Sequence, residues 1–235
     1  MPTTAKLGTI TIGQAPRPDI TPILERHLPP GIPCVHAGLL DGLTREDIAQ
    51  RYPEQPGQPT LITRLRDGSS VVVDKARMLA LLKQKVEALQ AQGCNFVLVL
   101  CTGAFEDLHA EKAWLIEPDL IVSPAVAALA GGRQVGVIVP LASQMASEAH
   151  KWRALAHPPL CAAASPYTDD TAPVAQAAID LGQQGADVLV LDCMGFVERH
   201  RAAAAEASGL PVILSNSIIA RLTAELLSVD RAARS

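Results

Sequence analysis

Short apolar runs alternate with amphipathic segments along this chain. The continuous apolar runs Phe96–Leu100, Val135–Val139 and Val188–Leu191 predict buried strands. Between Asp74, a helix N-cap, and Gly93, a helix stop, apolar residues recur at the spacing of a long helix. Apolar strands separated by helices are typical of parallel sheets that helices cover on both faces. The pattern therefore predicts an α/β fold.

Weaker signals complete the expected order of elements. Thr44 with Asp47 three residues later is a capping box for a short helix, and Asp67 with Gly68 predicts a hairpin between two strands. Asp19 is the expected N-cap of an early helix. The remaining expected strands span residues 7–12, 32–39 and 212–214, and the remaining expected helices span residues 20–27, 143–156, 171–184, 196–207 and 217–227.

The chain contains an internal sequence repeat. Residues 93–103 align without a gap with residues 185–195, so that a helix-stop glycine, an apolar strand, a cysteine and a glycine recur in the same order. The cysteines of the two copies are Cys101 and Cys193. Repeated strand–helix units can produce such a match anywhere, but the shared cysteine favours two related halves. We expect domains at residues 1–130 and 131–235, and the C-terminal helix can pack back on the first domain.

Composition argues against several classes of protein. The formal charge of −4 leaves no basic surface for nucleic acid, and an aromatic content of 3% argues against base stacking. No run approaches the ~18 apolar residues that a membrane span needs, and the first residues hold no signal-peptide core. Five cysteines, an odd number without the CxxC spacing of zinc sites, favour free thiols in the cytoplasm.

Ligands of parallel sheets lie beyond the carboxyl ends of the strands, where Cys101 and Cys193 are expected. If the two halves face each other, the two sulfurs lie within roughly 10 Å across a cleft, and a carbon between them is within reach of both. A thiolate on one side then removes a proton alpha to a carboxylate, and a thiol on the other side returns one. Helix N-termini, expected after both cysteines, would lower the thiol pKa to allow this. Cys34, Cys94 and Cys161 instead have the ordinary role of small buried apolar residues.

Polar residues near the expected strand ends add candidate binding groups. Arg17 either clamps a carboxylate with two hydrogen bonds or lies on the surface. Thr102 either donates its hydroxyl to a ligand or caps a helix, and the glycines after the cysteines let backbone N–H groups approach a carboxylate. Glu198 and Arg201 are spaced for an ion pair on a solvated helix face that also holds His200. Both tryptophans are expected to be packing residues.

Six stretches along the chain carry a resemblance to a known family: TITIGQAPR at 9–17, LLDGL at 39–43, LCTG at 100–103, QVGVIVP at 134–140, LDCMGF at 191–196 and LSNS at 214–217. At these residues the chain resembles the AroM family, within the aspartate/glutamate racemase superfamily. The AroM family implies no settled activity. The superfamily, which includes racemases, a maleate isomerase and a decarboxylase, implies two flavodoxin-like (Rossmann-like) three-layer domains with parallel sheets. It also implies a pseudo-twofold arrangement, an active site between the domains and no cofactor.

The resemblance implies catalytic roles for Cys101 and Cys193. The candidate substrate-binding residues come from both halves: Thr11, Gly13, Gln14, Arg17, Thr102, Gly103, Met194 and Gly195. Racemases of the superfamily usually read Cys-Asn-Thr at the first cysteine and Cys-Thr at the second, whereas this chain reads Cys-Thr-Gly and Cys-Met-Gly-Phe. Because Met194 carries no hydroxyl, we expect a substrate that is less polar than aspartate or that lacks the amino group.

Two functions of different classes fit these residues. One is a cofactor-independent racemase- or isomerase-like enzyme that acts on a small carboxylate by two-cysteine acid/base chemistry, or with one cysteine as nucleophile. The other is a non-catalytic small-molecule binding or regulatory protein associated with aromatic amino-acid metabolism. Only the enzyme would exchange the substrate's alpha proton with deuterated solvent. The sequence leaves the substrate and the oligomeric state open, a homo-oligomer included.

Overall fold

The first sheet holds four parallel strands in the order β2-β1-β5-β6. The computed structural model describes residues 5–228, apart from the side chains of residues 147–149. The strands of this sheet are β1 (Leu7–Thr11), β2 (Cys34–Gly38), β5 (Phe96–Leu100) and β6 (Trp114–Ile116). β5 is buried along its whole length, which agrees with its continuous apolar sequence.

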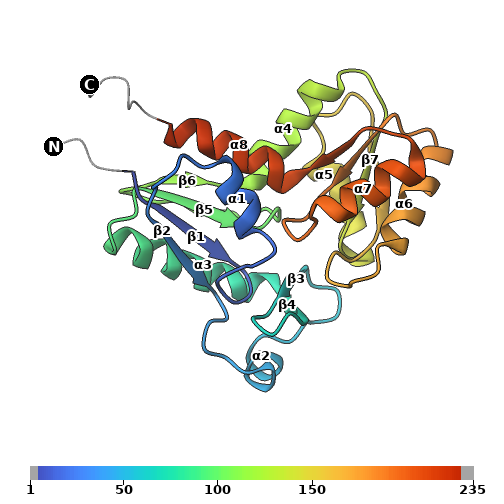
Figure 1. The fold of residues 1–235 in the computed structure, drawn as a ribbon. Helices are drawn as coiled ribbons and strands as arrows, with labels where there is room; N and C mark the ends of the chain where they lie inside the picture. The colour runs from blue at the N-terminus through green and yellow to red at the C-terminus, as the bar shows by residue number, and fades with distance from the viewer. Residues whose placement is uncertain (1–4, 229–235) are drawn as a thin grey trace, which may run out of the picture.

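Helices cover both faces of this sheet (Figure 1). α3 (Lys75–Ala91) packs Met78 and Leu82 into one core cluster with Val97 and Val99 of β5. On the other face, α1 (Thr21–His27) contributes to a second cluster that includes Leu98. Because successive side chains of a strand point to opposite faces, β5 serves both clusters at once.

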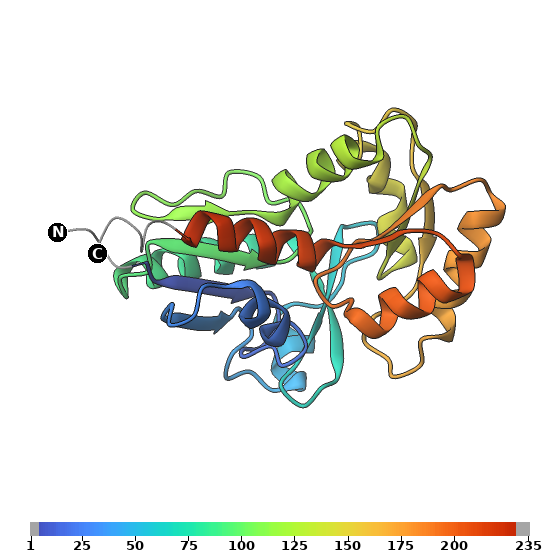
Figure 2. The same cartoon turned by 45° about the horizontal axis from the view of Figure 1, so that its top comes forward.

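A hairpin and a short helix extend from the first domain. β3 (Thr60–Arg64) and β4 (Ser70–Asp74) pair antiparallel, as the Asp-Gly turn predicts. Figure 2 shows this hairpin (cyan) reaching toward the second domain. α2 (Arg45–Arg51) begins at the predicted capping box of Thr44 and Asp47.

The second sheet repeats the first. Its order is β10-β9-β7-β8, and all its strands are parallel: β7 (Val135–Val139), β8 (Leu160–Ala163), β9 (Val188–Leu191) and β10 (Val212–Leu214). Read from its other edge, the second sheet has the order β8-β7-β9-β10, which corresponds to β2-β1-β5-β6, so β5 and β9 hold the same place. The two-domain α/β architecture that the repeat predicts is confirmed, and each cysteine follows the third strand of its sheet.

The helices of the second half are η1 (Ala142–Ser147, a 3₁₀ helix), α5 (Glu148–Lys151), α6 (Ala172–Gln183), α7 (Glu198–Ser208) and α8 (Ser215–Leu227). α8 packs against α1 and α4 (Pro118–Ala130), and Figure 1 shows it running back along the first domain. One core cluster contains Leu98 from the first sheet and Val137 from the second, so apolar contacts join the two domains. The boundary at residue 130 stays a prediction.

Several local expectations were wrong or incomplete. The expected helix at 143–156 is only the short pair η1 and α5. β6, α4 and β8 were not expected: β6 and β8 are short edge strands, and α4 carries Pro118 at its start and Pro124 inside. Asp19 does not cap α1, because its carboxylate pairs with Arg17. Trp152 is buried as expected, whereas Trp114 is 64% exposed.

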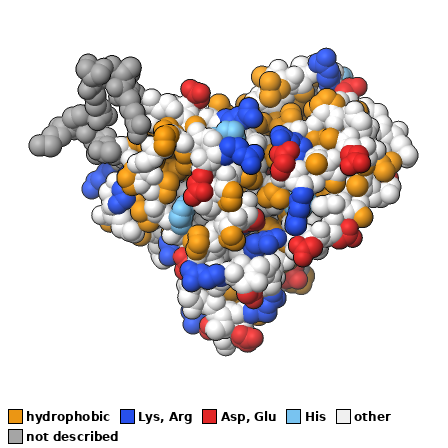
Figure 3. Space-filling model, viewed as in Figure 1, with side chains coloured by type: hydrophobic (Ala, Val, Ile, Leu, Met, Phe, Trp, Pro, Cys, Tyr) orange, Lys and Arg blue, Asp and Glu red, His pale blue; other side chains and the backbone are white. Residues whose placement is uncertain are grey.

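Figure 3 shows the two lobes with a notch between them at the upper edge, and Lys and Arg side chains gather along the middle of this face. Among the described residues, no helix is both long enough and apolar enough to cross a membrane.

Candidate active site

Cys101 and Cys193 line one cleft, whose volume is about 800 Å³. The first domain supplies Ile12, Leu61 and Lys75 to its walls, and the second supplies Tyr167, Met194 and other residues. The two thiols come to the same cleft because each follows the corresponding strand of its sheet, and the carboxyl ends of parallel strands share one edge.

The two cysteines have the same local geometry. The N–H of Gly103 donates to the sulfur of Cys101 at 3.4 Å, and the N–H of Gly195 donates to the sulfur of Cys193 at 3.4 Å. We expected these amides to bind a carboxylate, but each is aimed at its own cysteine. A hydrogen bond to the sulfur favours the thiolate, so the repeated turn is a device that stabilises the charged form.

The overall thiol pKa nevertheless shifts upward. Burial raises the pKa of Cys101 to about 11, against the smaller lowering effect of the Gly103 amide. Burial also raises the pKa of Cys193, although the Gly195 amide, Tyr167 and Arg17 each lower it. The expectation of thiol pKa values below the ordinary one was wrong. No helix begins directly after Cys101, where a loop leads to β6, and α7 starts only at Glu198.

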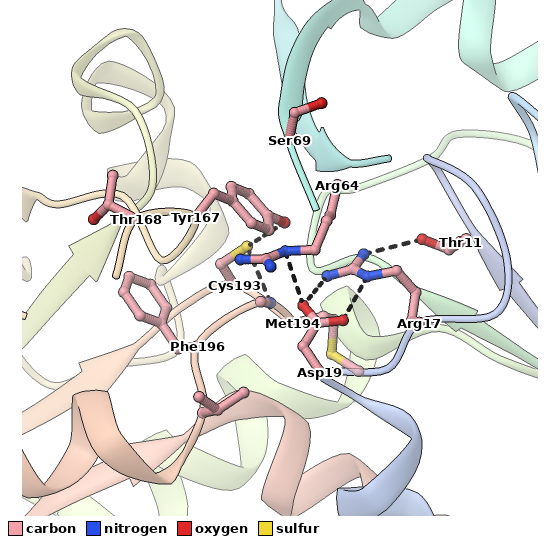
Figure 4. Close-up of polar contacts among 12 residues, drawn as sticks. Thr11, Arg17, Asp19, Arg64, Ser69, Tyr167, Thr168, Cys193, Met194 and Phe196 are labelled. Carbon is pink, nitrogen blue, oxygen red and sulfur yellow. Dashed lines mark hydrogen bonds and ion pairs between the residues drawn. The ribbon is translucent and has the colours of Figure 1, made fainter. Parts of the chain in front are cut away.

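Tyr167 completes the surroundings of Cys193 (Figure 4). Its hydroxyl lies 3.6 Å from the Cys193 sulfur. The guanidinium groups of Arg17 and Arg64 lie 5.8 and 5.4 Å from the centre of its ring. A side chain at Gly195 would meet this ring, since a Cβ there would lie 2.7 Å from Tyr167 Cε1. Sequence reasoning missed Tyr167, which lies in a loop before α6 and carries no motif.

Arg17 is buried rather than on the surface. Its guanidinium donates to the Asp19 carboxylate with two bonds, Nε to Oδ1 at 2.8 Å and Nη2 to Oδ2 at 2.7 Å. Nη1 donates to the hydroxyl of Thr11 at 3.1 Å. Arg17 thus forms the predicted two-bond clamp, but the carboxylate in it belongs to the protein.

Thr11, Gly13 and Gln14 are not among the residues that line the cleft. The Thr11 hydroxyl accepts a hydrogen bond from the Arg17 guanidinium. Gly13 lets the hairpin approach, because a Cβ there would lie 2.0 Å from the Arg64 carbonyl oxygen. The Gln14 amide donates to the carbonyls of Leu40 and Leu43 and accepts from the N–H of Arg66. It thus connects the loop between β2 and α2 to the β3–β4 hairpin. These three residues are engaged with the protein itself, and a contact between them and a substrate stays a prediction.

On the other side of the cleft, one lysine connects both cysteine turns. Lys151 Nζ donates to the carbonyl oxygen of Thr102 at 2.7 Å and pairs with the carboxylate of Asp192. The hydroxyl of Thr102 donates to the Asp192 carbonyl at 3.4 Å rather than capping a helix, and its contact with a ligand stays a prediction. Ser215 adds a donor to the Asp192 carboxylate at 3.3 Å. Lys151, which the sequence reasoning missed, therefore joins the residue after Cys101 to the residue before Cys193.

Two more charged residues lie in the cleft wall. Lys75 is the first residue of α3, and its ammonium lies 5.8 Å from the centre of the Phe105 ring. Asp119 in the first turn of α4 has a buried carboxylate oxygen without a hydrogen-bond partner in the described part of the chain. Burial raises the pKa of Asp119.

His200 does not lie on a solvated face, as was expected. It is fully buried, its Nδ1 accepts a hydrogen bond from the N–H of Val197, and its ring meets Phe196 edge-on. Burial lowers the pKa of His200 to about 4, so it is a neutral packing residue at physiological pH. The expected ion pair of Glu198 and Arg201 is confirmed.

The chain matches a known protein family over most of its length. A sequence model described as AroM protein matches residues 7–227. The chain belongs to the AroM family. Among curated proteins, no sequence match was found.

Solved structures show how widely this fold is shared. A glutamate racemase isoform from Bacillus anthracis superposes with a TM-score of 0.64 at 17% identity, over 96% of this chain and 82% of that one. An allantoin racemase from Klebsiella pneumoniae gives 0.63 at 15%, over 96% and 88%. Unliganded arylmalonate decarboxylase gives 0.58 at 15%, over 97% and 94%. The AroM chain therefore has the fold of the aspartate/glutamate racemase superfamily.

Proposed function

We propose that this AroM protein is a racemase- or isomerase-like enzyme that acts on a small carboxylate by two-cysteine acid/base chemistry, without a cofactor. One observation carries the proposal. Two thiols, each with an N–H donor aimed at its sulfur, line one cleft from corresponding strands of two related domains. The similar fold of the racemases and the decarboxylase named above supports the same class of chemistry.

The reaction begins when one cysteine, as thiolate, takes the alpha proton of the bound acid and becomes a thiol. The electron pair of the broken C–H bond moves toward the carboxylate, so negative charge builds on its oxygens. The second cysteine gives its proton to the opposite face of the carbon and becomes a thiolate. Atoms and charge balance, and the two cysteines have exchanged roles.

The glycine N–H groups have a defined part in this cycle. Each stabilises its sulfur when that sulfur is charged, and the geometry is the same at both positions. Tyr167 and Arg17 add to this at Cys193, and Lys151 and Lys75 add to it at Cys101. The charged form is thus supported whichever cysteine holds the proton.

The substrate in this proposal is a carboxylic acid with an apolar part. Met194 stands where racemases usually have a hydroxyl, and Ile12, Leu61 and Pro124 add apolar walls. All five cysteines are free thiols, which suits the cytoplasmic location that we propose with this chemistry.

The raised thiol pKa values favour a second candidate, a protein that binds a small acid without turning it over. The two are separated by incubating the wild type and a Cys101→Ser/Cys193→Ser double variant in deuterated water with chiral carboxylic acids, with and without an alpha-amino group. The proposal expects deuterium at the alpha carbon of at least one acid with the wild type alone. Acids that bind without exchange in the wild type would identify the binding protein instead.

A further inference from the structure

A substrate carboxylate needs an anchor, and the groups first expected to hold it are already engaged. The two-bond clamp of Arg17 is filled by Asp19. The amides of Gly103 and Gly195 donate to the cysteine sulfurs. The other cations of the cleft are therefore the candidates for the anchor.

Those cations differ in their partners. Lys151 is paired with Asp192 and the Thr102 carbonyl. Arg153 is exposed at the rim and contacts His150. Lys75 is half-buried, and no carboxylate among the side chains that the structure describes forms an ion pair with it.

The position of Lys75 is unfavourable on local grounds. It is the first residue of a 17-residue helix, and the N-terminal end of a helix carries partial positive charge that repels a cation. No acidic residue follows in the first turn, and the carboxylate of the N-cap Asp74 is used by the N–H of Arg77. A cation held against a positive helix end, in a cleft, suits an anion that comes from outside.

We propose that Lys75 is the residue that binds the substrate carboxylate, and that it selects acids whose reactive carbon then lies against Cys101. The assignment of the reactive carbon rests on the proposed function, whereas the carboxylate anchor does not. Lys75 and Cys101 line the same cleft, and the positive charge of Lys75 acts on the Cys101 thiol. Leu61 lines this side of the cleft near Gly103, so the substituents of the acid meet an apolar contact there.

Two alkylating reagents test this anchor without any knowledge of the substrate. Iodoacetate and iodoacetamide both react with the thiolate, but only iodoacetate carries a carboxylate. The ratio of their rates at Cys101, measured by mass spectrometry, reports carboxylate recognition, since any change in the thiol pKa cancels. The variants are Lys75→Met and Lys75→Arg, and Lys83→Met is a matched control on the same helix outside the cleft.

The inference expects Lys75→Met to lower the iodoacetate-to-iodoacetamide ratio at Cys101 by about tenfold, the size of a charged hydrogen bond. Lys75→Arg should keep most of the ratio, and Lys83→Met should leave it unchanged. An unchanged ratio in Lys75→Met, or no labelling of Cys101 by iodoacetate in the wild type, would overturn the inference. Because the ratio needs no turnover, a protein that shows it but exchanges no protons would retain the anchor and refute only the enzyme.

Discussion

The two cysteine turns are alike in their backbone and different in what surrounds them. Each sulfur follows the third strand of its sheet and accepts an N–H two residues on. Tyr167 and Arg17 act to lower the pKa of Cys193, whereas Lys151 and Lys75 act to lower the pKa of Cys101. The repeat thus accounts for the placement of the thiols, and the segments that are not repeated account for their electrostatics.

Each turn is also completed by the other domain. Arg17 and Arg64 of the first domain face Tyr167 beside Cys193, and Lys151 of the second domain holds the carbonyl after Cys101. Neither half-site exists in one domain alone. Either thiol therefore has its full set of neighbours only when the two domains are docked.

The reactivity of Cys101 should depend strongly on pH. The ordinary thiol pKa is 9.0, and desolvation inside the cleft raises the pKa of Cys101 to about 11. Its alkylation by iodoacetamide should therefore rise about tenfold per pH unit and keep rising above pH 9. The raised pKa also contributes to the stability of the fold below pH 9, and this contribution is lost as the pH rises toward 11. The free energy of unfolding of Cys101→Ala should therefore change less with pH between 9 and 11 than that of the wild type. A labelling rate that levels off near pH 9 would contradict the raised pKa.

Removing Lys151 should break the connection between the turns. Lys151→Met leaves the carboxylate of Asp192, whose side chain is 1% exposed, without its cation. Loss of one partner of a buried pair costs about 3–5 kcal/mol of the free energy of unfolding, which denaturant titration measures. The double variant Lys151→Met/Asp192→Asn should regain part of the lost free energy of unfolding, because it also removes the unpaired buried charge. Lys85→Met, the control, should leave the free energy of unfolding unchanged. A loss below about 1 kcal/mol in the single variant would show that the pair contributes little.

The two glycines should respond unequally to the same substitution. A Cβ at Gly195 would lie 2.7 Å from the Tyr167 ring, whereas a Cβ at Gly103 meets the flexible end of Leu61 at 3.2 Å. We expect Gly195→Ala to lower the free energy of unfolding by about 1–3 kcal/mol, and Gly103→Ala to lower it by less. Equal losses in thermal or denaturant unfolding would mean that the two turns are equally crowded.

Tyr167→Phe is the mildest test of the asymmetry. It removes the hydroxyl beside Cys193, which is one of the groups that lower the pKa of that thiol. Because a hydrogen bond of this kind is worth about 1 kcal/mol, alkylation of Cys193 should slow about fivefold. Labelling of Cys101 should not change, and an equal effect on both cysteines would remove Tyr167 from the account.

The strands and their repetition could be predicted from the sequence because a buried strand is a continuous run of apolar residues. β5, β7 and β9 have the bounds that were expected. β6 and β8 were not predicted, because short strands at the edge of a sheet contain few consecutive apolar residues. The position of Arg17 near the site was also predictable, but its partner Asp19 was assigned to a cap.

The residues that tune the thiols could not be predicted in this way. Tyr167 and Lys151 lie outside the repeated segments, and they meet the cysteine turns only through tertiary packing. The direction of the thiol pKa shift was also missed. Desolvation depends on how closely the whole cleft surrounds a sulfur, which neither periodicity nor motif records.

The proposed mechanism requires the two thiols to act on opposite faces of one bound acid. The most direct measurement is alpha-proton exchange in deuterated water for each enantiomer of an acid that the wild type exchanges, repeated with Cys101→Ala and with Cys193→Ala. Each thiol faces one side of the carbon, so each variant should lose exchange from one enantiomer and retain it for the other. Exchange of both enantiomers that survives either substitution, or that depends on one cysteine alone, would contradict the account.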